Sequence, residues 1–250
     1  MCQWKMEALS PSVRVCVSKE HRFGTDAFLL ADFARHGVKD RVLDLCAGCG
    51  ILPLLLCKRR PPREIHALEL QPEATALMEQ GIAASGLSHR IFPHLGDLRL
   101  LTRTGPSPFP GLEPGSFDLV TCNPPYFDSR GILSAQESQR TARHETQCSI
   151  RQVCAAASRQ LRYGGRFCLC YRPQRLSQLF SALVENGLEP KRLRMVQKDP
   201  ASAPWLVLCE GKKGAKPFLQ VLPPLFIRGQ EQGGFSEELV DIYDWQQPGG

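Results

Sequence analysis

Short apolar segments alternate with helix-like segments from about residue 40 onward. The segments expected to form strands are residues 41–46, 64–70, 90–97, 116–123, 166–171, 191–197 and 204–210. Between them, residues 50–58, 72–86, 149–163 and 173–187 have helical character. Strands that alternate with helices in this way form parallel sheets covered by helices. The pattern therefore predicts an α/β fold, a mostly parallel twisted sheet of about seven strands with helices on both faces.

Local signals set some of the expected helix ends. Pro72 stands where proline is favoured, in the first turn of a helix, and Gly86 is expected to end that helix. Ser149 is expected to cap the helix that follows it. The glycine pair 164–165 is expected to end this helix near residue 163.

The chain is expected to form one domain overall, in which residues 1–40 add a strand and a helix beside the main unit at 41–250. Two segments break the alternation. Residues 104–116 are rich in proline and glycine, which predicts a surface loop. Residues 127–147 are polar and follow the end of a strand, where the loops of such sheets usually contact a substrate.

Composition limits the cellular setting. With 250 residues, 42% of them apolar, the chain can bury the core of one large domain or two small ones. Residues 1–30 contain charges and no apolar run of signal-peptide length, and nowhere do about 18 apolar residues run together. We expect a cytoplasmic protein without membrane contact.

The chain has 11 cysteines, an odd number, and no export signal, so reduced thiols are expected. Cys46 and Cys49 have the spacing of a redox or zinc half-site. A second C-x-x-C is missing, however, and both residues lie in a glycine-rich turn, so we expect no metal. Cys168 and Cys170 alternate with apolar residues and are expected on one face of a strand.

The net charge of +6 is concentrated in residues 151–216. Such a basic block can form a surface that faces phosphates, or its charges can belong to solvated faces of helices and strands. The sequence leaves both interpretations open. The block includes Arg151, Arg159, Arg162, Arg166, Arg172, Arg175, Lys191, Arg192, Arg194, Lys212, Lys213 and Lys216.

The segment VLDLCAGCG joins the first strand of the alternating region to a helix. Gly48 and Gly50 let a ligand approach the backbone of this turn, and N–H groups at the helix start can face an anion. Glu69 ends the next strand, where a carboxylate can accept hydrogen bonds from both hydroxyls of a ribose. These positions predict a site for a nucleoside-bearing cofactor. A glycine-rich turn without a ligand is the simpler alternative.

Two features decide which cofactor is favoured. A dinucleotide turn needs a further glycine three positions after Gly50, where this chain has Pro53. Asp44, just before the turn, would repel a pyrophosphate but suits the positive charge of S-adenosylmethionine. We therefore expect S-adenosylmethionine rather than a nicotinamide cofactor.

Two further segments are candidates for the same site. Upstream, Gly24, Thr25 and Asp26 precede an apolar helix, and Thr25 or Asp26 either caps that helix or flanks the cofactor. Downstream, Asp97 follows the third strand, where it either accepts a hydrogen bond from the amine of an adenine or caps a turn.

The fourth strand runs directly into Asn123-Pro124-Pro125-Tyr126. The prolines fix the backbone and remove two donors, so the turn presents an amide beside an aromatic ring. An exocyclic aromatic amine needs acceptors on its N–H bonds to become a good nucleophile, and the Asn123 side chain and the Pro124 carbonyl can supply them. Tyr126 can stack on the flat substrate. A rigid turn without chemistry is the alternative.

Together these segments resemble the bacterial tRNA adenine-N6 methyltransferases, which modify the purine 3′ of the anticodon in a valine tRNA. The resemblance covers nearly the full chain and includes RFGTDAFLLADFA, VLDLCAGCGILPLLL, FDLVTCNPPYF and VLPPLFIRGQEQGGFSEELVDIY. It implies a Rossmann-like class I methyltransferase fold, S-adenosylmethionine as donor and tRNA as partner. One departure is Cys46, at a position where such turns usually have glycine.

Individual roles follow from the resemblance and from the chemistry of the side chains. The residues expected to bind the donor are Gly24, Thr25, Asp26, Asp44, Gly48, Gly50, Glu69, Leu70, Asp97, Leu98 and Asn123. The residues expected to hold the target amine are Asn123, Pro124, Pro125 and Tyr126. The residues expected to contact RNA phosphates are Arg140, Arg143 and His144. We expect the enzyme to act as a monomer.

Three other functions fit part of the pattern. A glutamine methyltransferase acting on peptide release factors uses the same Asn-Pro-Pro-Tyr turn, but such enzymes carry a helical domain before the glycine turn, and only residues 1–43 precede Asp44 here. A guanine-N2 rRNA methyltransferase has similar chemistry. A non-catalytic RNA-binding protein could keep the fold, but it would have no need of Glu69, Asp97 and Asn123.

Overall fold

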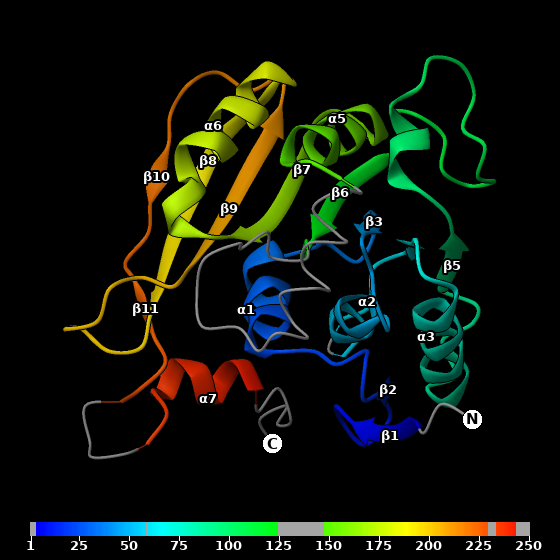
Figure 1. Cartoon of the computed structure of the whole chain (residues 1–250), viewed down its shortest axis with the longest axis horizontal. Coiled ribbons are helices and arrows are strands. Elements are labelled where there is room, and N and C mark those ends of the chain that lie inside the picture. The colour runs from blue at the N-terminus through cyan, green and yellow to red at the C-terminus, as the bar shows by residue number, and fades with distance from the viewer. Residues whose placement is uncertain (1–3, 59, 125–147, 230–233, 244–250) are drawn as a thin grey trace.

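The computed structural model (Figure 1) describes residues 4–58, 60–124, 148–229 and 234–243. In this part of the chain a sheet of nine strands forms the centre of the molecule. The order across the sheet is β10 (Gln220–Val221), β8 (Leu188–Gln197), β9 (Leu206–Lys213), β7 (Leu161–Tyr171), β6 (Phe117–Cys122), β3 (Arg41–Leu45), β4 (Glu64–Glu69) and β5 (Ile91–Leu95), with β11 (Leu225–Phe226) beside β8. Strand β9 is antiparallel to both of its neighbours, and the other pairs in this sheet are parallel. The predicted mostly parallel α/β sheet is confirmed, with two short strands at one edge in addition to the seven expected.

Helices cover both faces of the sheet (Figure 1), each over its own apolar core. One core contains side chains of α1 (Thr25–Ala34), α2 (Ile51–Leu56), α3 (Pro72–Ala84) and α7 (Glu237–Tyr243). The other contains those of α5 (Ile150–Gln160), α6 (Leu176–Glu185) and the 3₁₀ helix η1 (Leu98–Thr102). A shorter 3₁₀ helix, η2 (Pro173–Arg175), leads into α6. Within the described ranges, no helix is long and apolar enough to span a membrane.

The strand β7 shows how the sequence pattern becomes two faces. Phe167 and Leu169 pack into the core under α5 and α6, whereas Cys168 and Cys170 pack into the core under α1. Successive side chains of a strand point to opposite faces. The expectation that the two cysteines share one face is therefore confirmed.

The residues before β3 form a hairpin followed by α1, where the sequence predicted one strand and a helix. Strands β1 (Trp4–Ala8) and β2 (Arg14–Ser18) make a separate two-stranded sheet. This hairpin packs closely on α3, because Gly81 has no side chain: a Cβ there would lie 3.2 Å from the backbone nitrogen of Cys16. The hydroxyl of Ser85 also accepts a hydrogen bond from the Arg14 N–H at 2.9 Å.

The predicted helix ends are partly confirmed. Ser149 caps α5 in a capping box with Gln152, each side chain accepting a hydrogen bond from the backbone N–H of the other. The predicted end of α5 is wrong, because the helix stops at Gln160 and the glycine pair 164–165 lies inside β7. Leu161 already pairs with Phe117 of β6, and a register shift follows that pair. Gly164, at φ +77°, therefore serves an irregular strand rather than a helix end.

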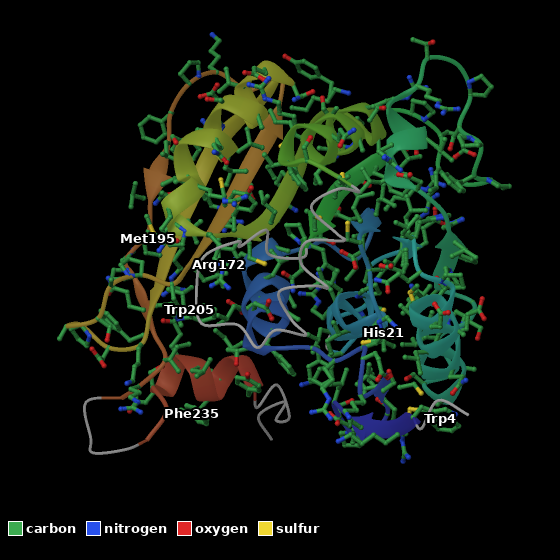
Figure 2. The ribbon with its side chains drawn as sticks, viewed as in Figure 1. Trp4, His21, Arg172, Met195, Trp205 and Phe235 are labelled. Carbon is green, nitrogen blue, oxygen red and sulfur yellow. The ribbon has the colours of Figure 1, made fainter. Side chains whose placement is uncertain are left out.

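Several members of the basic block at 151–216 hold the fold together. Arg166 and Arg192 both contact the carboxylate of Glu210, at 3.5 and 2.7 Å. Arg151 pairs with Glu185, Arg162 with Asp118, and Arg194 with Glu238. At the other end of β7, Arg172 donates a hydrogen bond to the carbonyl of Trp205 at 3.2 Å, and Figure 2 shows these two side chains near each other.

Candidate active site

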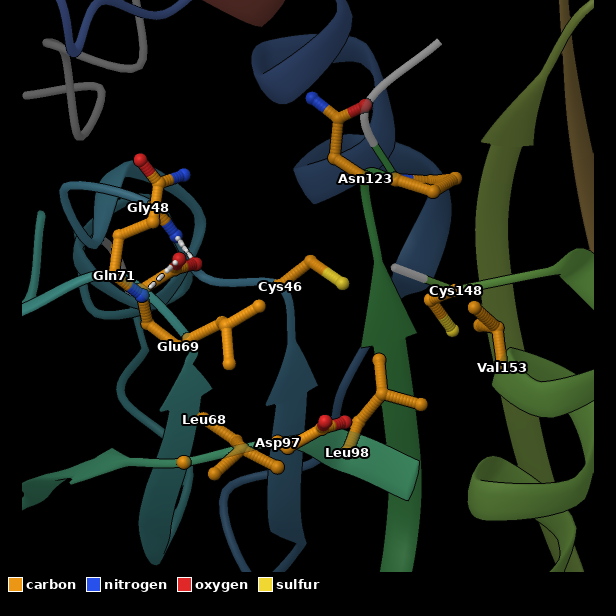
Figure 3. Close-up of a pocket in the computed structure, with 13 residues that line it drawn as sticks. Cys46, Gly48, Leu68, Glu69, Gln71, Asp97, Leu98, Asn123, Cys148 and Val153 are labelled. Carbon is orange, nitrogen blue, oxygen red and sulfur yellow. Dashed lines mark hydrogen bonds between the residues drawn. The ribbon is translucent and has the colours of Figure 1, made fainter. Parts of the chain in front are cut away.

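A cavity of about 200 Å³ opens at the carboxyl ends of β3, β4 and β6 (Figure 3). Ligands of open parallel sheets bind at the carboxyl ends of the strands. The lining residues come from the end of β4, from the segments after β3, β4, β5 and β6, from the first residue of η1, and from the start of α5 with the segment before it. They are Cys46, Gly48, Leu68, Glu69, Leu70, Gln71, Gly96, Asp97, Leu98, Asn123, Pro124, Cys148 and Val153.

The cavity unites many of the residues proposed from the sequence. Those that line it are Gly48, Glu69, Leu70, Asp97, Leu98, Asn123 and Pro124. Gly24, Thr25, Asp26, Asp44 and Gly50 are not among the lining residues. Pro125, Tyr126, Arg140, Arg143 and His144 lie outside the described residues.

Six lining residues were not predicted from the sequence, and one of them, Cys46, lies in the glycine turn itself. Leu68, Gln71 and Gly96 are next to predicted site residues in the chain, so the local motifs could have found them. Cys148 and Val153 had no such signal, because tertiary packing brings the start of α5 to the cavity.

The two glycines of the turn have different roles. Gly48, at φ +56°, would place a Cβ in open space, and its N–H donates to Oε2 of Glu69 at 2.8 Å. Gly50, at φ +80°, would place a Cβ only 2.6 Å from Cγ of Met78. The missing side chain of Gly48 therefore leaves space in the cavity for a ligand, whereas that of Gly50 lets α2 pack on α3.

The carboxylate of Glu69 is fixed at the cavity wall by two backbone donors. Besides the bond from Gly48, its Oε1 accepts a hydrogen bond from the Gln71 N–H at 2.9 Å, and Figure 3 shows both contacts. Glu69 is 6% exposed. Each carboxylate oxygen can accept more than one hydrogen bond, so Glu69 can still receive the hydroxyls of a ribose.

Asp44 is buried beneath the turn and is not among the residues that line the cavity, so its role at the methionine end of the donor stays a prediction. Along β3 its side chain alternates with the buried Leu43 and Leu45 and so lies on the face that carries α1 and α2. There its Oδ1 accepts a hydrogen bond from the Thr121 hydroxyl at 2.7 Å. Burial raises the pKa of Asp44 to about 8, and the charge of Glu69 acts in the same direction.

For Asp97 the structure confirms the capping role, whereas the hydrogen bond to an adenine amine stays a prediction. Asp97 caps η1, because its Oδ1 accepts a hydrogen bond from the Arg99 N–H at 2.8 Å, and it also lines the cavity. Burial alone would raise the pKa of Asp97, but hydrogen bonds from Arg99 and the charge of its guanidinium outweigh burial and lower the pKa. Asp97 therefore presents a fixed, ionised acceptor near the floor of the cavity shown in Figure 3.

The start of α1 reaches Asn123 at the end of β6. Nδ2 of Asn123 donates to Oδ2 of Asp26 at 3.1 Å, and Oδ1 of Asn123 accepts from the Cys170 thiol at 2.8 Å. The position of Asp26 at the edge of the site fits the flanking role proposed for it. The alternative that Thr25 or Asp26 is the N-cap is wrong, because Gly24 occupies that position and no side chain caps the helix.

The cysteines of the glycine turn face different surroundings. Cys46 has φ +60°, an uncommon conformation outside glycine, and its thiol lines the cavity. Cys49 is buried, and this burial raises its pKa to about 11. The described residues contain no group of three or more His, Cys, Asp or Glu side chains that could hold a metal ion.

The structure is similar to solved methyltransferases. A predicted O-methyltransferase, Atu636 from Agrobacterium tumefaciens, has a TM-score of 0.69 and 21% identity, with 88% of this chain and 95% of that chain covered. Trm5 of Methanocaldococcus jannaschii in complex with adenosine has a TM-score of 0.59 and 17% identity, with 86% of this chain and 57% of that chain covered. At these identities the likeness shows the fold, which is the Rossmann-like fold of class I methyltransferases.

Sequence relatives define the family more closely. The family model "Methyltransferase small domain" matches residues 17–187. A "tRNA1(Val) (adenine(37)-N6)-methyltransferase" of Porphyromonas gingivalis is 32% identical over 76% of this chain and 73% of its own length. A protein of the same name from Cronobacter sakazakii is 29% identical over 75% of this chain and 73% of its own. The chain belongs to the methyltransferase small domain family and, within it, to the tRNA1(Val) (adenine(37)-N6)-methyltransferases.

Proposed function

We propose that this protein transfers a methyl group from S-adenosylmethionine to the N6 amine of adenine 37, beside the anticodon of tRNA1(Val). The observation that carries the proposal is that Asn123 and Pro124 line the same cavity as Glu69 and Asp97. A group that can hold a planar amine thus lies within one hollow with acceptors for a ribose and an adenine. The family membership supports the same substrate.

The cavity fits the donor. The missing side chain of Gly48 leaves room at the turn, Glu69 offers acceptors for the ribose, and Asp97 offers an acceptor for the adenine amine. Apolar side chains suited to the faces of the adenine ring are Leu68, Leu70, Leu98 and Val153. When bound, S-adenosylmethionine supplies a methyl group made electrophilic by a sulfonium.

The chain itself supplies positioning. Oδ1 of Asn123 and the carbonyl of Pro124 accept hydrogen bonds from the two N–H groups of the adenine amine. These hydrogen bonds reduce the delocalisation of the nitrogen lone pair into the ring and direct the lone pair toward the methyl carbon. With the donor bound, the amine so held would form an N–C bond as the C–S bond of the donor breaks, and the methylated nitrogen would lose its extra proton to water. Correct alignment of reactants alone can lower such a barrier by about 7–11 kcal/mol. Pro125 and Tyr126 complete this turn in the proposal, with Tyr126 stacked on the base.

Basic residues that follow the carboxyl ends of the strands are proposed to hold the RNA. Arg172 follows β7 and Lys198 follows β8, at the sheet edge where β6 ends in Asn123. Arg140, Arg143 and His144 are proposed as further phosphate contacts. The target base must leave its stack to enter the cavity, which an anticodon loop allows at low cost. We also propose that the enzyme is monomeric and acts in the cytoplasm, where its tRNA substrate is used.

Methylation of defined tRNA transcripts tests the function. Labelled S-adenosylmethionine should label tRNA1(Val) carrying A37 and not a transcript with G37, and digestion should release N6-methyladenosine. Asn123→Ala should abolish labelling, because it removes an acceptor for the substrate amine, and should largely keep donor affinity measured by calorimetry, because Glu69 and Asp97 remain to hold the donor. Release of N2-methylguanosine, or labelling of a release factor with no labelling of tRNA, would overturn the proposal in favour of the corresponding rival enzyme. Donor binding without labelling of any substrate would favour the non-catalytic alternative.

A further inference from the structure

The amide of Asn123 is held by side chains from two other elements. Asp26 reaches it from the first turn of α1, and Cys170 reaches it from β7. Asp26 and Asn123 are 97 residues apart in the chain, and Asn123 and Cys170 are 47 residues apart. Cys170 is fully buried. Tertiary packing, rather than the Asn-Pro-Pro-Tyr turn alone, therefore creates this arrangement.

The chemistry of the two partners selects one orientation of the amide. An ionised carboxylate can only accept hydrogen bonds, so Asp26 must face the NH₂ group of Asn123. A thiol can donate, so Cys170 faces the oxygen. Rotating the amide by 180° would bring its oxygen against the carboxylate of Asp26 and would leave the thiol facing NH₂. The two ends of an amide are similar in size, and hydrogen bonding must therefore decide between them.

Asp26 is itself held in place. Its Oδ1 accepts a hydrogen bond from the Ala27 N–H at 3.0 Å, which leaves Oδ2 for Asn123. Gly24 makes room for this carboxylate, because a Cβ on Gly24 would lie 2.8 Å from Oδ1 of Asp26. The backbone of Gly24, at φ −118°, is one that any residue can adopt. Its lack of a side chain is therefore needed for space and not for conformation.

We propose that Asp26 and Cys170 are positioning residues that fix the Asn123 amide with its oxygen available to the substrate amine. The proposal rests on the methyl-transfer function for its effect on rate. The oxygen retains a lone pair after it accepts the Cys170 thiol, and this lone pair receives one N–H of the substrate. The carboxylate of Asp26 also polarises the amide, which increases the negative charge on the oxygen that accepts the amine.

Asp26→Asn tests the orientation with little change in shape. The new amide can donate as well as accept, so both orientations of Asn123 become possible. We expect kcat to fall by roughly 10–100-fold, the size of loss that a small misplacement of a catalytic group can cause. Donor affinity should change much less than kcat, because Asp26 does not line the cavity. Asp32→Asn, on the same helix, is the matched control and should keep kcat.

Cys170 provides a second and independent variant. Cys170→Ala removes the donor and should lower kcat, while Cys170→Ser keeps a donor at the same place and should restore most of the rate. Cys168→Ala is the matched control, since Cys168 lies on the same face of β7 and contacts Glu210 instead of Asn123. Gly24→Ala should lower kcat as Asp26→Asn does, because the added methyl group displaces the carboxylate.

Nuclear magnetic resonance of the ¹⁵N-labelled Asn123 side chain separates this proposal from the methylation assay. Asn123→Ala assigns its two amide protons, whose shifts should differ widely in the wild type because one is bonded to Asp26. In Asp26→Asn the difference between the chemical shifts of these two protons should become smaller. Unchanged shifts in Asp26→Asn, or equal losses of kcat and donor affinity, would overturn the proposal. If the shifts respond as expected and the wild type fails to methylate tRNA, the positioning of Asn123 by Asp26 and Cys170 is supported and the proposed function is contradicted.

Discussion

At the scale of single residues, Gly48 and Gly50 look alike in the sequence but have different structural roles. Both Gly48 and Gly50 have positive φ, which costs any other residue about 1–2 kcal/mol. Only Gly50 is also crowded, by Met78, whereas the space next to Gly48 is the cavity itself. The same substitution should therefore lower stability more at Gly50 than at Gly48 and should weaken ligand binding at Gly48.

Gly48→Ala and Gly50→Ala form a matched pair. Gly48→Ala should lower the free energy of unfolding by about 1 kcal/mol through backbone strain and should weaken donor binding, because its methyl group enters the cavity. Gly50→Ala should cost about 1–3 kcal/mol more, since the added methyl group meets Met78. Urea unfolding and donor calorimetry measure the two effects. Partial recovery of stability in Gly50→Ala combined with Met78→Ala is expected, and its absence would contradict the packing explanation.

Asp44→Asn should change the dependence of stability on pH. Burial raises the pKa of Asp44 to about 8 in the folded protein, whereas an aspartate in the unfolded chain titrates near pH ~4. Between these values the folded protein keeps a proton that the unfolded chain has released, so this group makes stability fall as pH rises. Asparagine does not ionise, and the stability of Asp44→Asn relative to the wild type should increase from about pH 4 to about pH 8. A difference that stays constant across urea titrations in this range would contradict the raised pKa.

At the scale of elements, the sequence predicted those parts that depend on neighbours in the chain. The strands β3, β4 and β6, the start of α3 at Pro72 and the Ser149 cap of α5 follow from local periodicity, local backbone preference and local hydrogen bonding. The end of α5 was missed because strand pairing with β6 decides it. The site divides in the same way: Gly48, Glu69 and Asp97 belong to local motifs, whereas the contacts of Asn123 with Asp26 and Cys170 arise from packing.

The cap of α5 should matter for the cavity as well as for the helix. Ser149→Ala removes the side-chain acceptor of the capping box and should lower the free energy of unfolding by about 1 kcal/mol. Fraying of the first turn would also displace Cys148 and Val153, which line the cavity, so donor affinity should fall. Ser149→Thr keeps an acceptor at the same place and serves as the control in urea unfolding and calorimetry. Full donor affinity in Ser149→Ala would show that the cavity does not depend on this cap.

At the scale of the whole molecule, basic residues lie in two groups, one at each end of the strands of the sheet. Strands β7 and β8 are both antiparallel to β9, so Arg172, Arg175 and Lys198 follow carboxyl ends that lie on the same side of the sheet as Asn123. Lys191 and Lys212 lie toward the opposite ends of β8 and β9. The basic residues of 151–216 therefore form two groups, one at each end of these strands, rather than one phosphate-facing surface.

Salt dependence of tRNA binding tests this division. Replacing Arg172, Arg175 and Lys198 together with alanine should make the slope of log K against log salt shallower by roughly 2–3, because each lost phosphate contact removes a little under one unit. The matched triple at the other end of the strands, Lys191, Lys212 and Lys216, should leave the slope unchanged. Fluorescence anisotropy over a range of salt concentrations measures both. Equal effects of the two triples would favour diffuse electrostatic attraction over a defined contact surface.

One contact ties the early and late parts of the chain together. The Tyr243 hydroxyl of α7 donates to Oγ1 of Thr25 at 2.8 Å across 218 residues, and its ring stacks on Phe28 with centroids 4.4 Å apart. Thr25 precedes Asp26, so the contact of Asp26 with Asn123 is supported by a helix near the other end of the chain. A variant that ends before α7 would keep every residue that lines the cavity and lose this support at the first turn of α1.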